Sequence, residues 1–329
     1  MQYVAPFWLP GGNLQTIWSA IVARSVPGAP PEFHRERWAT PDGDFVDVDF
    51  LDEPAKKAGQ RPLLVLFHGL EGSSRSHYAQ SFAHFARQQG MAYAVPHFRG
   101  CSGELNLAPR AYHSGDYEEI GWILGQLRER HDASGGGPMV AVGVSLGGNA
   151  LMRWAEEAGS EASRVVSAVS SVSAPLDLAA GGTAIGQGFN RLVYTRMFLN
   201  TMKPKALAKL AQHPGLFDGD ALRQARDLYT FDNIFTAPLH GFKNTDDYWK
   251  RGSAKPHLDA VRIPALVVNA RNDPFVPAAS LPRQQDVGSH VTLWQPAHGG
   301  HVGFAAGLPP GHVSSLPGEV GGWLMQHVR

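Results

Sequence analysis

The chain has 329 residues, and its 29 basic and 29 acidic side chains balance, which excludes the broad positive field expected of a nucleic-acid-binding protein. Cys101 is the single cysteine, which excludes an intrachain disulfide framework and suits a reducing, cytoplasmic compartment. The stretch 1–24 has neither a basic n-region nor a long apolar h-region, so no signal peptide is expected. No run of about 18 apolar residues predicts a transmembrane segment.

Strand and helix patterns then alternate along the chain. Two stretches that alternate apolar with polar residues flank the turn Pro41–Asp44 and predict an antiparallel hairpin. Strands are expected at 33–40, 45–51, 63–67, 91–96, 139–144, 165–172, 265–269 and 291–294, and helices at 76–89, 117–128, 149–158 and 319–328. This order predicts an α/β fold with a mostly parallel eight-stranded sheet and helices on both faces.

The segment 176–256 interrupts this alternation. It carries helical patterns at 189–202 and 204–212 but no strand of the sheet's type, and such an insertion is most simply a cap over the strand ends. Its many Phe, Tyr, Leu and Met side chains fit ordinary helix packing as well as an apolar lid over an acyl-binding pocket. We therefore divide the chain into a core (1–175 and 257–329, with 1–30 as an N-terminal extension) and a helical cap (176–256).

The five residues Gly143-Val144-Ser145-Leu146-Gly147 stand between a predicted strand and a predicted helix. A serine on such a sharp turn adopts strained backbone angles, and Gly143 and Gly147 leave the room that this requires. The following helix would direct its N-terminus at Ser145 and place the Leu146 N–H beside an oxyanion. The pattern predicts Ser145 as a nucleophile.

A nucleophilic serine needs a histidine base and a carboxylate, which in this fold follow in the order serine, acid, histidine. Asp273 ends the loop after the strand at 265–269, and prolines on its C-terminal side stiffen that loop. It is therefore the preferred acid. Asp246, Asp247 and Asp259 are poorer candidates because they lie on the predicted cap or before the strand.

The base is expected after the last strand, where His298 and His301 compete. The glycines before His301 allow the loop to turn back toward the sheet, and Gly303-Phe304 is expected to begin a helix packed below it. We favour His301. His298 is either a hydrogen-bond donor that orders the loop or the base itself.

A second oxyanion donor should follow the third strand, where the chain reads His68-Gly69-Leu70-Glu71-Gly72. The glycines allow backbone N–H groups to converge, and we choose that of Leu70, although an ordinary glycine-rich turn fits the same sequence. The histidines that could gather near the strand ends are His68, His97, His113, His298 and His301. Because no H-E-x-x-H or paired Cys/His spacing is present, neither a metal nor another cofactor is expected.

Longer motifs stand at 10–17, 68–74, 97–103, 112–115, 238–242, 247–249 and 300–304. Together they resemble the motifs of the YheT-like family of α/β-hydrolases, the AB hydrolase 4 group, and the resemblance covers nearly the whole chain. Asn13 stands where histidine is commoner in that family, and His97 stands where asparagine is commoner. Neither departure touches Ser145 or its expected partners.

The resemblance implies the α/β-hydrolase fold and a serine hydrolase that cleaves carboxylic esters, with the charge-relay residues at Ser145, Asp273 and His301. We interpret Arg99 as a loop anchor. Three histidines are expected to support the site through hydrogen bonds to its residues rather than by touching the substrate: His68, His113 and His298.

The expected reaction is a two-step acyl transfer from a small-molecule ester with a short to medium acyl chain, or from a lipid-like ester, to water. Eukaryotic relatives resemble lipid esterases and acyltransferases, so transfer to an alcohol is the main alternative, and a non-catalytic binding protein on the same fold is another. Peripheral contact with a membrane would use Phe7, Trp8 and Trp18, although burial of these aromatic rings is the preferred interpretation.

Overall fold

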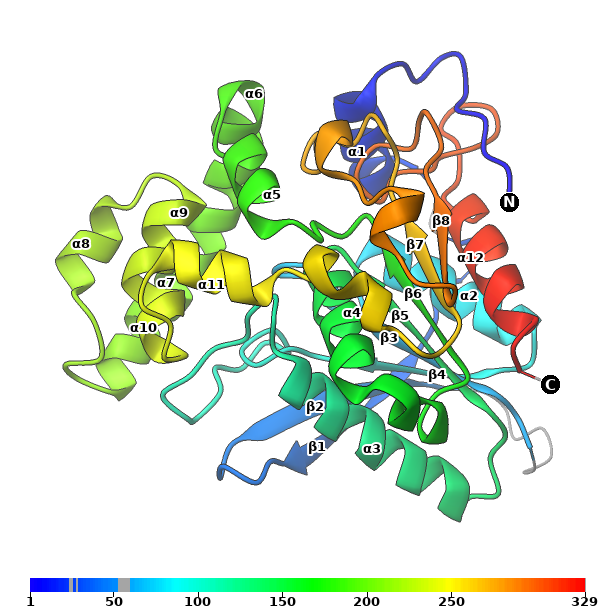
Figure 1. Ribbon diagram of the computed structural model, residues 1–329, viewed down its shortest axis with the longest axis horizontal. Coiled ribbons are helices and arrows are strands. Elements are labelled where there is room, and N and C mark those ends of the chain that lie inside the picture. Colours follow the sequence, from blue (N-terminus) through cyan, green and yellow to red (C-terminus); the bar gives the residue numbers. More distant parts are fainter. Residues whose placement is uncertain (24–25, 28, 53–59, 329) are drawn as a thin grey trace.

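The computed structural model describes residues 1–23, 26–27, 29–52 and 60–328. Its centre is an eight-stranded sheet of order β1-β2-β4-β3-β5-β6-β7-β8 (Figure 1). The strands are β1 (Phe33–Ala39), β2 (Phe45–Leu51), β3 (Leu63–Phe67), β4 (Ala92–Pro96), β5 (Met139–Val144), β6 (Ala168–Val172), β7 (Ala265–Val268) and β8 (Val291–Trp294). Residues 24, 25 and 28 of the predicted N-terminal extension, and 53–59 and 329 of the predicted core, lie outside the described residues.

The sheet is mostly parallel, as predicted. β1 pairs antiparallel with β2, and β2 pairs antiparallel with β4. Every further neighbouring pair, from β4 and β3 through to β7 and β8, is parallel. The parallel strands direct their carboxyl ends to one edge, where the loops that carry a functional site normally lie.

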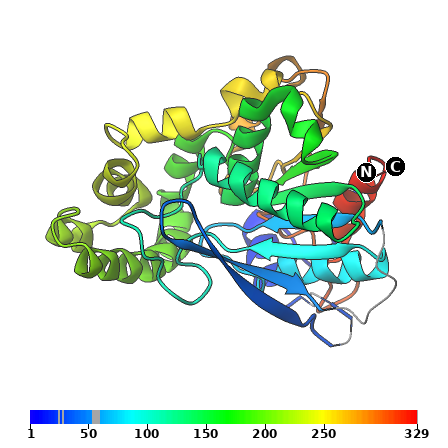
Figure 2. The same ribbon diagram turned by 90° about the horizontal axis from the view of Figure 1, so that it is seen from below.

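Helices cover both faces of this sheet, which confirms the predicted layers (Figure 2). α3 (Tyr117–Ala133) and α4 (Leu146–Ala158) pack on one face, and α2 (His77–Gln88) and α12 (Ser315–Met325) pack on the other. The remaining helices are α1 (Gly12–Ile21), α5 (Leu178–Ile185), α6 (Gly188–Asn190), α7 (Arg196–Gln212), α8 (Gly219–Gln224), α9 (Leu228–Phe231), α10 (Ala237–Leu239) and α11 (Thr245–Gly252).

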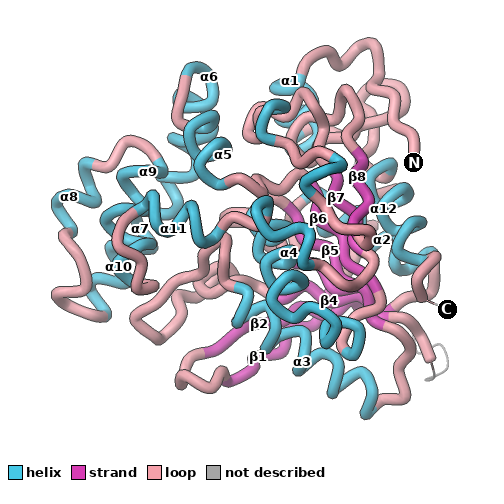
Figure 3. The backbone as a smooth tube through the Cα atoms, viewed as in Figure 1, coloured by secondary structure: helices cyan, strands magenta, loops and turns pink. Residues whose placement is uncertain are grey.

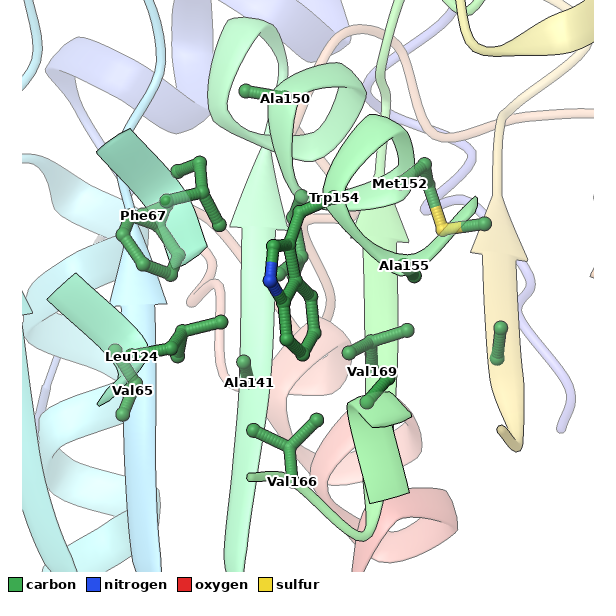
Figure 4. Packing of buried hydrophobic residues seen from close by; sticks show 14 of the residues in the cluster. Val65, Phe67, Leu124, Ala141, Ala150, Met152, Trp154, Ala155, Val166 and Val169 are labelled. Atoms are coloured by element: carbon green, nitrogen blue, oxygen red, sulfur yellow. The ribbon is translucent and has the colours of Figure 1, made fainter. Parts of the chain in front are cut away.

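The continuous apolar runs of the sequence are explained by burial of the central strands on both faces. In β3, Val65 and Phe67 point into the core under α3 and α4, whereas Leu64 and Leu66 point into the core under α2 and α12. Figure 4 shows the first of these cores, with the Trp154 indole of α4 lying among side chains of the sheet and of α3. A two-residue repeat cannot show up in the sequence of a strand whose two faces are both apolar.

Four helices differ from the prediction in their bounds by three residues or more. α3 ends at Ala133, five residues after the predicted end. α4 begins directly after Ser145, because that residue alone makes the turn out of β5. α12 begins at Ser315, four residues before the predicted start, and ends at Met325. α7 continues through Pro204, where two helices were expected, because Leu199 and Ala206 on either side of the proline both pack into one apolar cluster.

The helices α5 to α11 all lie between β6 and β7, and they gather to one side of the sheet (Figures 1 and 3). Residues 176–256 contain no strand, in agreement with the sequence pattern. Two apolar clusters hold these helices together, one around Phe231 and Phe235 and the other around Tyr248 and Trp249. The division of the chain into a core and a cap at these boundaries stays a prediction.

The N-terminal aromatic residues differ in their exposure. Phe7 is 93% exposed, so the expectation that it is buried is wrong. Trp8 and Trp18 are half-buried and pack edge to face with ring centroids 5.7 Å apart. Their indole N–H groups donate to Gly307 O and Pro310 O, which fixes both rings to the loop before α12.

Asn149 joins α4 to the loop before α3 and to the C-terminal end of the predicted cap, and we expect its loss to destabilise the fold. Its fully buried amide donates to Ser114 O and Gly252 O, at 2.7 Å each, and accepts from Ala254 N at 3.0 Å. Asn149→Leu leaves these three backbone groups without a partner, which should lower the free energy of unfolding by about 3 kcal/mol or more. Urea denaturation measures this change. Asn200→Leu, on the exposed side of α7, is the control, and equal midpoints for the two variants would contradict the assignment.

Candidate active site

Ser145 stands at the carboxyl end of β5 in a backbone conformation that side chains rarely adopt. Its φ is 53° and its ψ is −118°, and its N–H donates to Val172 O on the neighbouring strand at 2.8 Å. The flanking glycines leave no room for a side chain. A Cβ at Gly143 would lie 2.3 Å from Gly147 O, and a Cβ at Gly147 would lie 2.5 Å from His68 O. These close contacts explain the glycine spacing around Ser145.

A row of hydrogen bonds joins Ser145 to two residues far away in the sequence. His301 Nε2 lies 2.9 Å from Ser145 Oγ, and His301 Nδ1 lies 2.9 Å from Asp273 Oδ2. A carboxylate can only accept, so Nδ1 carries the ring proton and Nε2 accepts from the serine hydroxyl. The structure thus brings together the serine, the acid and the base chosen from the sequence.

Asp273 is held in place by the backbone that follows it. Its side chain is fully buried, and Oδ1 accepts the N–H groups of Phe275 and Val276 at 2.8 and 3.3 Å. The Phe275 ring also packs on the imidazole of His301, with centroids 4.2 Å apart. One carboxyl oxygen is therefore occupied by the loop, and the other is aimed at the histidine.

The loop of His301 is supported by α1, a role that the sequence analysis missed. Gln15 Oε1 accepts from Gly299 N at 2.9 Å, and Thr16 Oγ1 accepts from His301 N at 2.8 Å. Both side chains are buried. The N-terminal motif at 10–17 was the available signal, but no local pattern indicates contact with a loop some 285 residues away.

The helix expected at Gly303-Phe304 is absent, and that prediction is wrong. Val302 and Phe304 have φ values of 56° and 47°, in the left-handed region that a right-handed helix excludes. Val302 N donates to Ser173 Oγ at 3.1 Å rather than to a helical carbonyl. The loop after His301 is thus shaped by contacts to side chains.

We expect Thr16→Val to lower kcat for ester hydrolysis by roughly 10- to 100-fold, because a small displacement of a catalytic group has effects of this size. The substitution preserves shape but removes the acceptor of the His301 N–H. Steady-state kinetics on nitrophenyl butanoate measures the effect. Thr201→Val is the matched control, since among the residues that the structure describes Thr201 Oγ1 bonds only to Phe198 O, within α7. An unchanged kcat in Thr16→Val would refute the supporting role.

His298 lies on the exposed side of the same loop. Its Nδ1 is 3.4 Å from Asn272 Nδ2, which is a weak contact, and within the described residues it has no contact with Ser145 or Asp273. Between the two histidines that the sequence left in competition, only His301 faces the serine.

The turn at 69–72 contains one backbone N–H group without a partner. Gly69 N donates to Tyr78 Oη at 2.9 Å, Glu71 N to Tyr112 Oη at 3.1 Å, and Gly72 N to Gly69 O at 2.9 Å. Leu70 N alone in this turn has no hydrogen-bond partner in the described part of the chain. It is the donor that the sequence analysis chose for the oxyanion.

This turn lies against the serine. A Cβ at Gly69 would be 3.1 Å from Ser145 Cβ, so the backbone of the turn passes directly beside that residue. Leu146 is the first residue of α4, where N–H groups have no carbonyl within the helix to bond to. The N–H groups of Leu70 and Leu146 therefore both belong to segments next to the serine, and neither has a hydrogen-bond partner among the described residues.

His68 orders the turn at 69–72 from within the core. It is fully buried, its Nδ1 donates to Gly69 O at 2.8 Å, and its Nε2 accepts from Phe98 N at 3.1 Å. Burial, with a smaller effect from His97, lowers the pKa of His68 to about 3, so the ring is neutral. It holds the turn and has no hydrogen bond to Ser145.

His113 and Arg99 lie farther from Ser145. His113 Nδ1 accepts from Gly115 N at 3.2 Å, its ring lies 4.5 Å from that of His240, and burial lowers its pKa. Arg99 bonds to three carboxylates of other segments, Asp42, Asp44 and Glu119. Arg99 therefore anchors its loop, and His113 lines a cavity.

Ser145 and His301 open into a cavity of about 720 Å³. Its walls are largely apolar and come from both the core and the segment 176–256, including Leu178, Ile185, Phe198, Leu228, Trp249 and Phe275. A second cavity of about 590 Å³ adjoins it, and Leu70 and Leu146 line both. Within the described residues no cluster of three or more His, Cys, Asp or Glu side chains could hold a metal ion.

This fold, with a serine on a strained turn after the central strand, defines a large class of hydrolases. Residues 62–307 match the model of the alpha/beta hydrolase fold, and the chain belongs to this family. YheT of Escherichia coli (strain K12), named as a proposed esterase, is 37% identical over 319 residues, which cover 96% of this chain and 91% of YheT. The predicted YheT-like family is thereby confirmed.

Two further comparisons agree. Phospholipase ABHD3 of Mus musculus is 29% identical over 317 residues, which cover 94% of this chain and 74% of that protein. The structure of the Pyrococcus furiosus esterase Pf2001 superposes with a TM-score of 0.55 at 16% identity, covers 91% of this chain and 94% of its own, and shows the shared fold. The chain is an esterase- or lipase-type α/β-hydrolase. No helix among the described residues is long and apolar enough to cross a membrane.

Proposed function

We propose that this protein hydrolyses carboxylic esters through a covalent acyl intermediate on Ser145. The observation that supports this most is the row of hydrogen bonds from Asp273 through His301 to Ser145 Oγ, at 2.9 Å each, beside the unpartnered N–H of Leu70. A serine hydroxyl becomes nucleophilic when a histidine accepts its proton as it attacks. No other described group bonds to Ser145 Oγ.

The first half-reaction transfers the acyl group to the enzyme. Ser145 Oγ bonds to the ester carbonyl carbon while its proton moves to His301 Nε2, and the charge of Asp273 stabilises the imidazolium. The N–H groups of Leu70 and Leu146 stabilise the oxyanion of the tetrahedral intermediate. As the intermediate collapses, the bond to the leaving alcohol breaks, and that alcohol takes the proton from His301.

The second half-reaction releases the acid. Water attacks the acyl carbon while His301 accepts one of its protons, and the second tetrahedral intermediate collapses to return the proton to Ser145 Oγ. A Ser145 that stays free of acyl groups would be inconsistent with this route.

The cavity indicates the kind of ester. Its largely apolar walls suit a short to medium acyl chain or a lipid-like ester, and few of its side chains carry charge. The name of the mouse relative, a phospholipase, agrees with lipid-like esters.

A series of nitrophenyl esters of increasing acyl chain length, from acetate to palmitate, tests the proposal. We expect the wild-type protein to release nitrophenol, with kcat/KM highest for short to medium chains. Ethanol added to the same reactions identifies the acceptor: free acid supports hydrolysis, whereas ethyl ester as the main product would make the protein an acyltransferase. Absence of turnover across the whole series would reject ester hydrolysis and favour a binding protein on this fold.

A further inference from the structure

The residue after the candidate oxyanion donor is held in an unusual way. Gly72 N donates to Gly69 O at 2.9 Å and closes a four-residue turn, in which Glu71 takes the third position with a φ of 57°. Glycine normally occupies a left-handed position of this kind because it has no Cβ. A glutamate there is strained, so its side chain should provide something that glycine lacks.

The carboxylate of Glu71 makes two strong contacts. Tyr112 Oη donates to Glu71 Oε1 at 2.8 Å and in turn accepts from the Glu71 backbone N–H at 3.1 Å. The phenol hydroxyl is thus hydrogen-bonded to both the main chain and the side chain of Glu71. The Tyr112 ring is stacked on Phe98, with centroids 5.3 Å apart and planes 14° apart. Stacking on Phe98 therefore restrains the Tyr112 ring that makes both of these hydrogen bonds.

The second contact comes from the predicted cap. Lys205 Nζ of α7 lies 2.8 Å from Glu71 Oε2, and the carboxylate is only 10% exposed. One turn earlier on the same helix, Met202 lines both cavities. Glu71, Tyr112 and Lys205, which we name the Glu71 clasp, thus tie α7 to the turn that carries the Leu70 N–H.

The clasp fixes the C-terminal side of that turn, where Tyr112 of the predicted core and Lys205 of the predicted cap act together. Tyr78 and His68 hold the N–H and the carbonyl of Gly69, on the side of Leu70 that comes first in the chain. On the other side, Tyr112 Oη is the acceptor that the described part of the chain offers to the N–H of Glu71. The direction of the Leu70 N–H therefore depends on the clasp as well as on the core.

We infer that Glu71 is a positioning residue, which with Tyr112 and Lys205 aims the Leu70 N–H at the oxyanion and makes its placement depend on docking of α7. The inference rests on the proposed ester hydrolysis. It gives the motifs at 68–74 and 112–115 a shared role in catalysis rather than in folding alone. Neither Glu71 nor Tyr112 needs to touch the substrate for this purpose.

The variant Glu71→Gly tests this inference most sharply, because it relieves the backbone strain, keeps the N–H that Tyr112 accepts, and removes the carboxylate contacts to Tyr112 and Lys205. We expect an unchanged or higher Tm, a kcat lowered by roughly 10- to 100-fold, and a KM within about twofold, since loss of a whole oxyanion donor costs about 10²- to 10³-fold. A trifluoromethyl ketone, which forms a tetrahedral adduct with the serine, should lose affinity in parallel with kcat/KM. A wild-type kcat and inhibitor affinity, or a raised KM with an unchanged kcat, would overturn the inference.

Substitutions on α7 test the dependence on the cap. Lys205→Met should reproduce a lowered kcat, and Lys205→Arg should restore most of it, because arginine keeps a cation within reach of the carboxylate. Lys203→Met is the matched control on the same helix, since within the described residues Lys203 Nζ bonds only to Arg223 O. Equal kcat values for the Lys205 and Lys203 variants would overturn the dependence on α7.

The same assays separate this inference from the proposed function. Wild-type turnover that disappears in Ser145→Ala supports ester hydrolysis whatever the clasp variants do. If those variants then behave as wild type, the positioning role of the clasp is rejected and the proposed ester hydrolysis is not. If wild-type protein hydrolyses no ester, the proposed function is rejected, and the inference falls with it.

Discussion

Ser145→Ala is expected to lower kcat for ester hydrolysis by about 10⁶-fold, the loss seen when the serine of comparable hydrolases is removed. In the proposed mechanism the Oγ atom accepts the acyl group, and its hydrogen-bond partner is His301. Without Oγ no acyl intermediate can form, and the remaining N–H donors can act only on attack by water. The fold should not change, because alanine lacks only this one atom.

Release of nitrophenol from the best ester of the chain-length series measures this loss. Ser163→Ala is the matched control, since Ser163 is exposed and its hydroxyl bonds only to Ser160 O in the described part of the chain. We expect the control to keep the wild-type kcat. Turnover of Ser145→Ala within tenfold of wild type would remove the basis of the proposed mechanism.

Asp273→Asn is expected to lower kcat by about 10⁴-fold through the wrong tautomer of the histidine. The loop determines how the new amide would lie. The N–H groups of Phe275 and Val276 donate to Oδ1 and would keep the amide oxygen there, which turns the NH₂ group toward His301. The ring would then have to accept at Nδ1 and carry its proton on Nε2, where it could not accept the proton of Ser145.

This explanation requires that stability stays unchanged while kcat falls, because asparagine keeps both backbone contacts. Circular dichroism melts and steady-state kinetics on the same preparations measure the two quantities. Asp259→Asn serves as the control: Asp259 is exposed, and the sequence had left it as a weaker candidate for the acid. A larger loss of kcat in Asp259→Asn than in Asp273→Asn would show that the acid has been assigned wrongly.

Much of the fold follows from patterns that are local in the chain. The strands under both helical layers are continuous apolar runs, and the Ser145 turn is marked by glycines whose Cβ atoms would collide with neighbouring backbone. The order of serine, acid and histidine also follows from the chain, because each lies in a loop just after a strand of the parallel sheet. Such features depend only on neighbours in sequence or on sheet topology.

Other parts of the structure depend on contacts that no local pattern contains. Gln15 and Thr16 hold the loop of His301 from the opposite end of the chain. A helix was expected to begin at Gly303, but Val302 and Phe304 on either side of it have left-handed backbone conformations. The continuation of α7 through Pro204 likewise depends on an apolar cluster formed by later helices. Tertiary packing overrides local preference at each of these places.

Strained backbone marks the candidate site. Of the six non-glycine residues with positive φ among those described, Glu71, Ser145, Ser173, Val302 and Phe304 lie in the turn, elbow and loops around Ser145 and His301. Such conformations persist only where the surroundings hold them, as Tyr112 holds Glu71 and α1 holds the loop of His301. Tertiary contacts thus hold the strained residues of the site in place, whereas the strands and helices that carry them follow from local sequence.

Labelling with a fluorophosphonate, followed by intact-mass analysis and peptide mapping, tests the nucleophilic role of Ser145 most directly. The reagent forms a stable bond to a serine that a histidine activates, and it needs no knowledge of the natural ester. We expect one adduct per chain, located on Ser145, absent from Ser145→Ala and formed much more slowly by Asp273→Asn. An adduct on another serine, or ester hydrolysis without any adduct, would contradict the proposed mechanism.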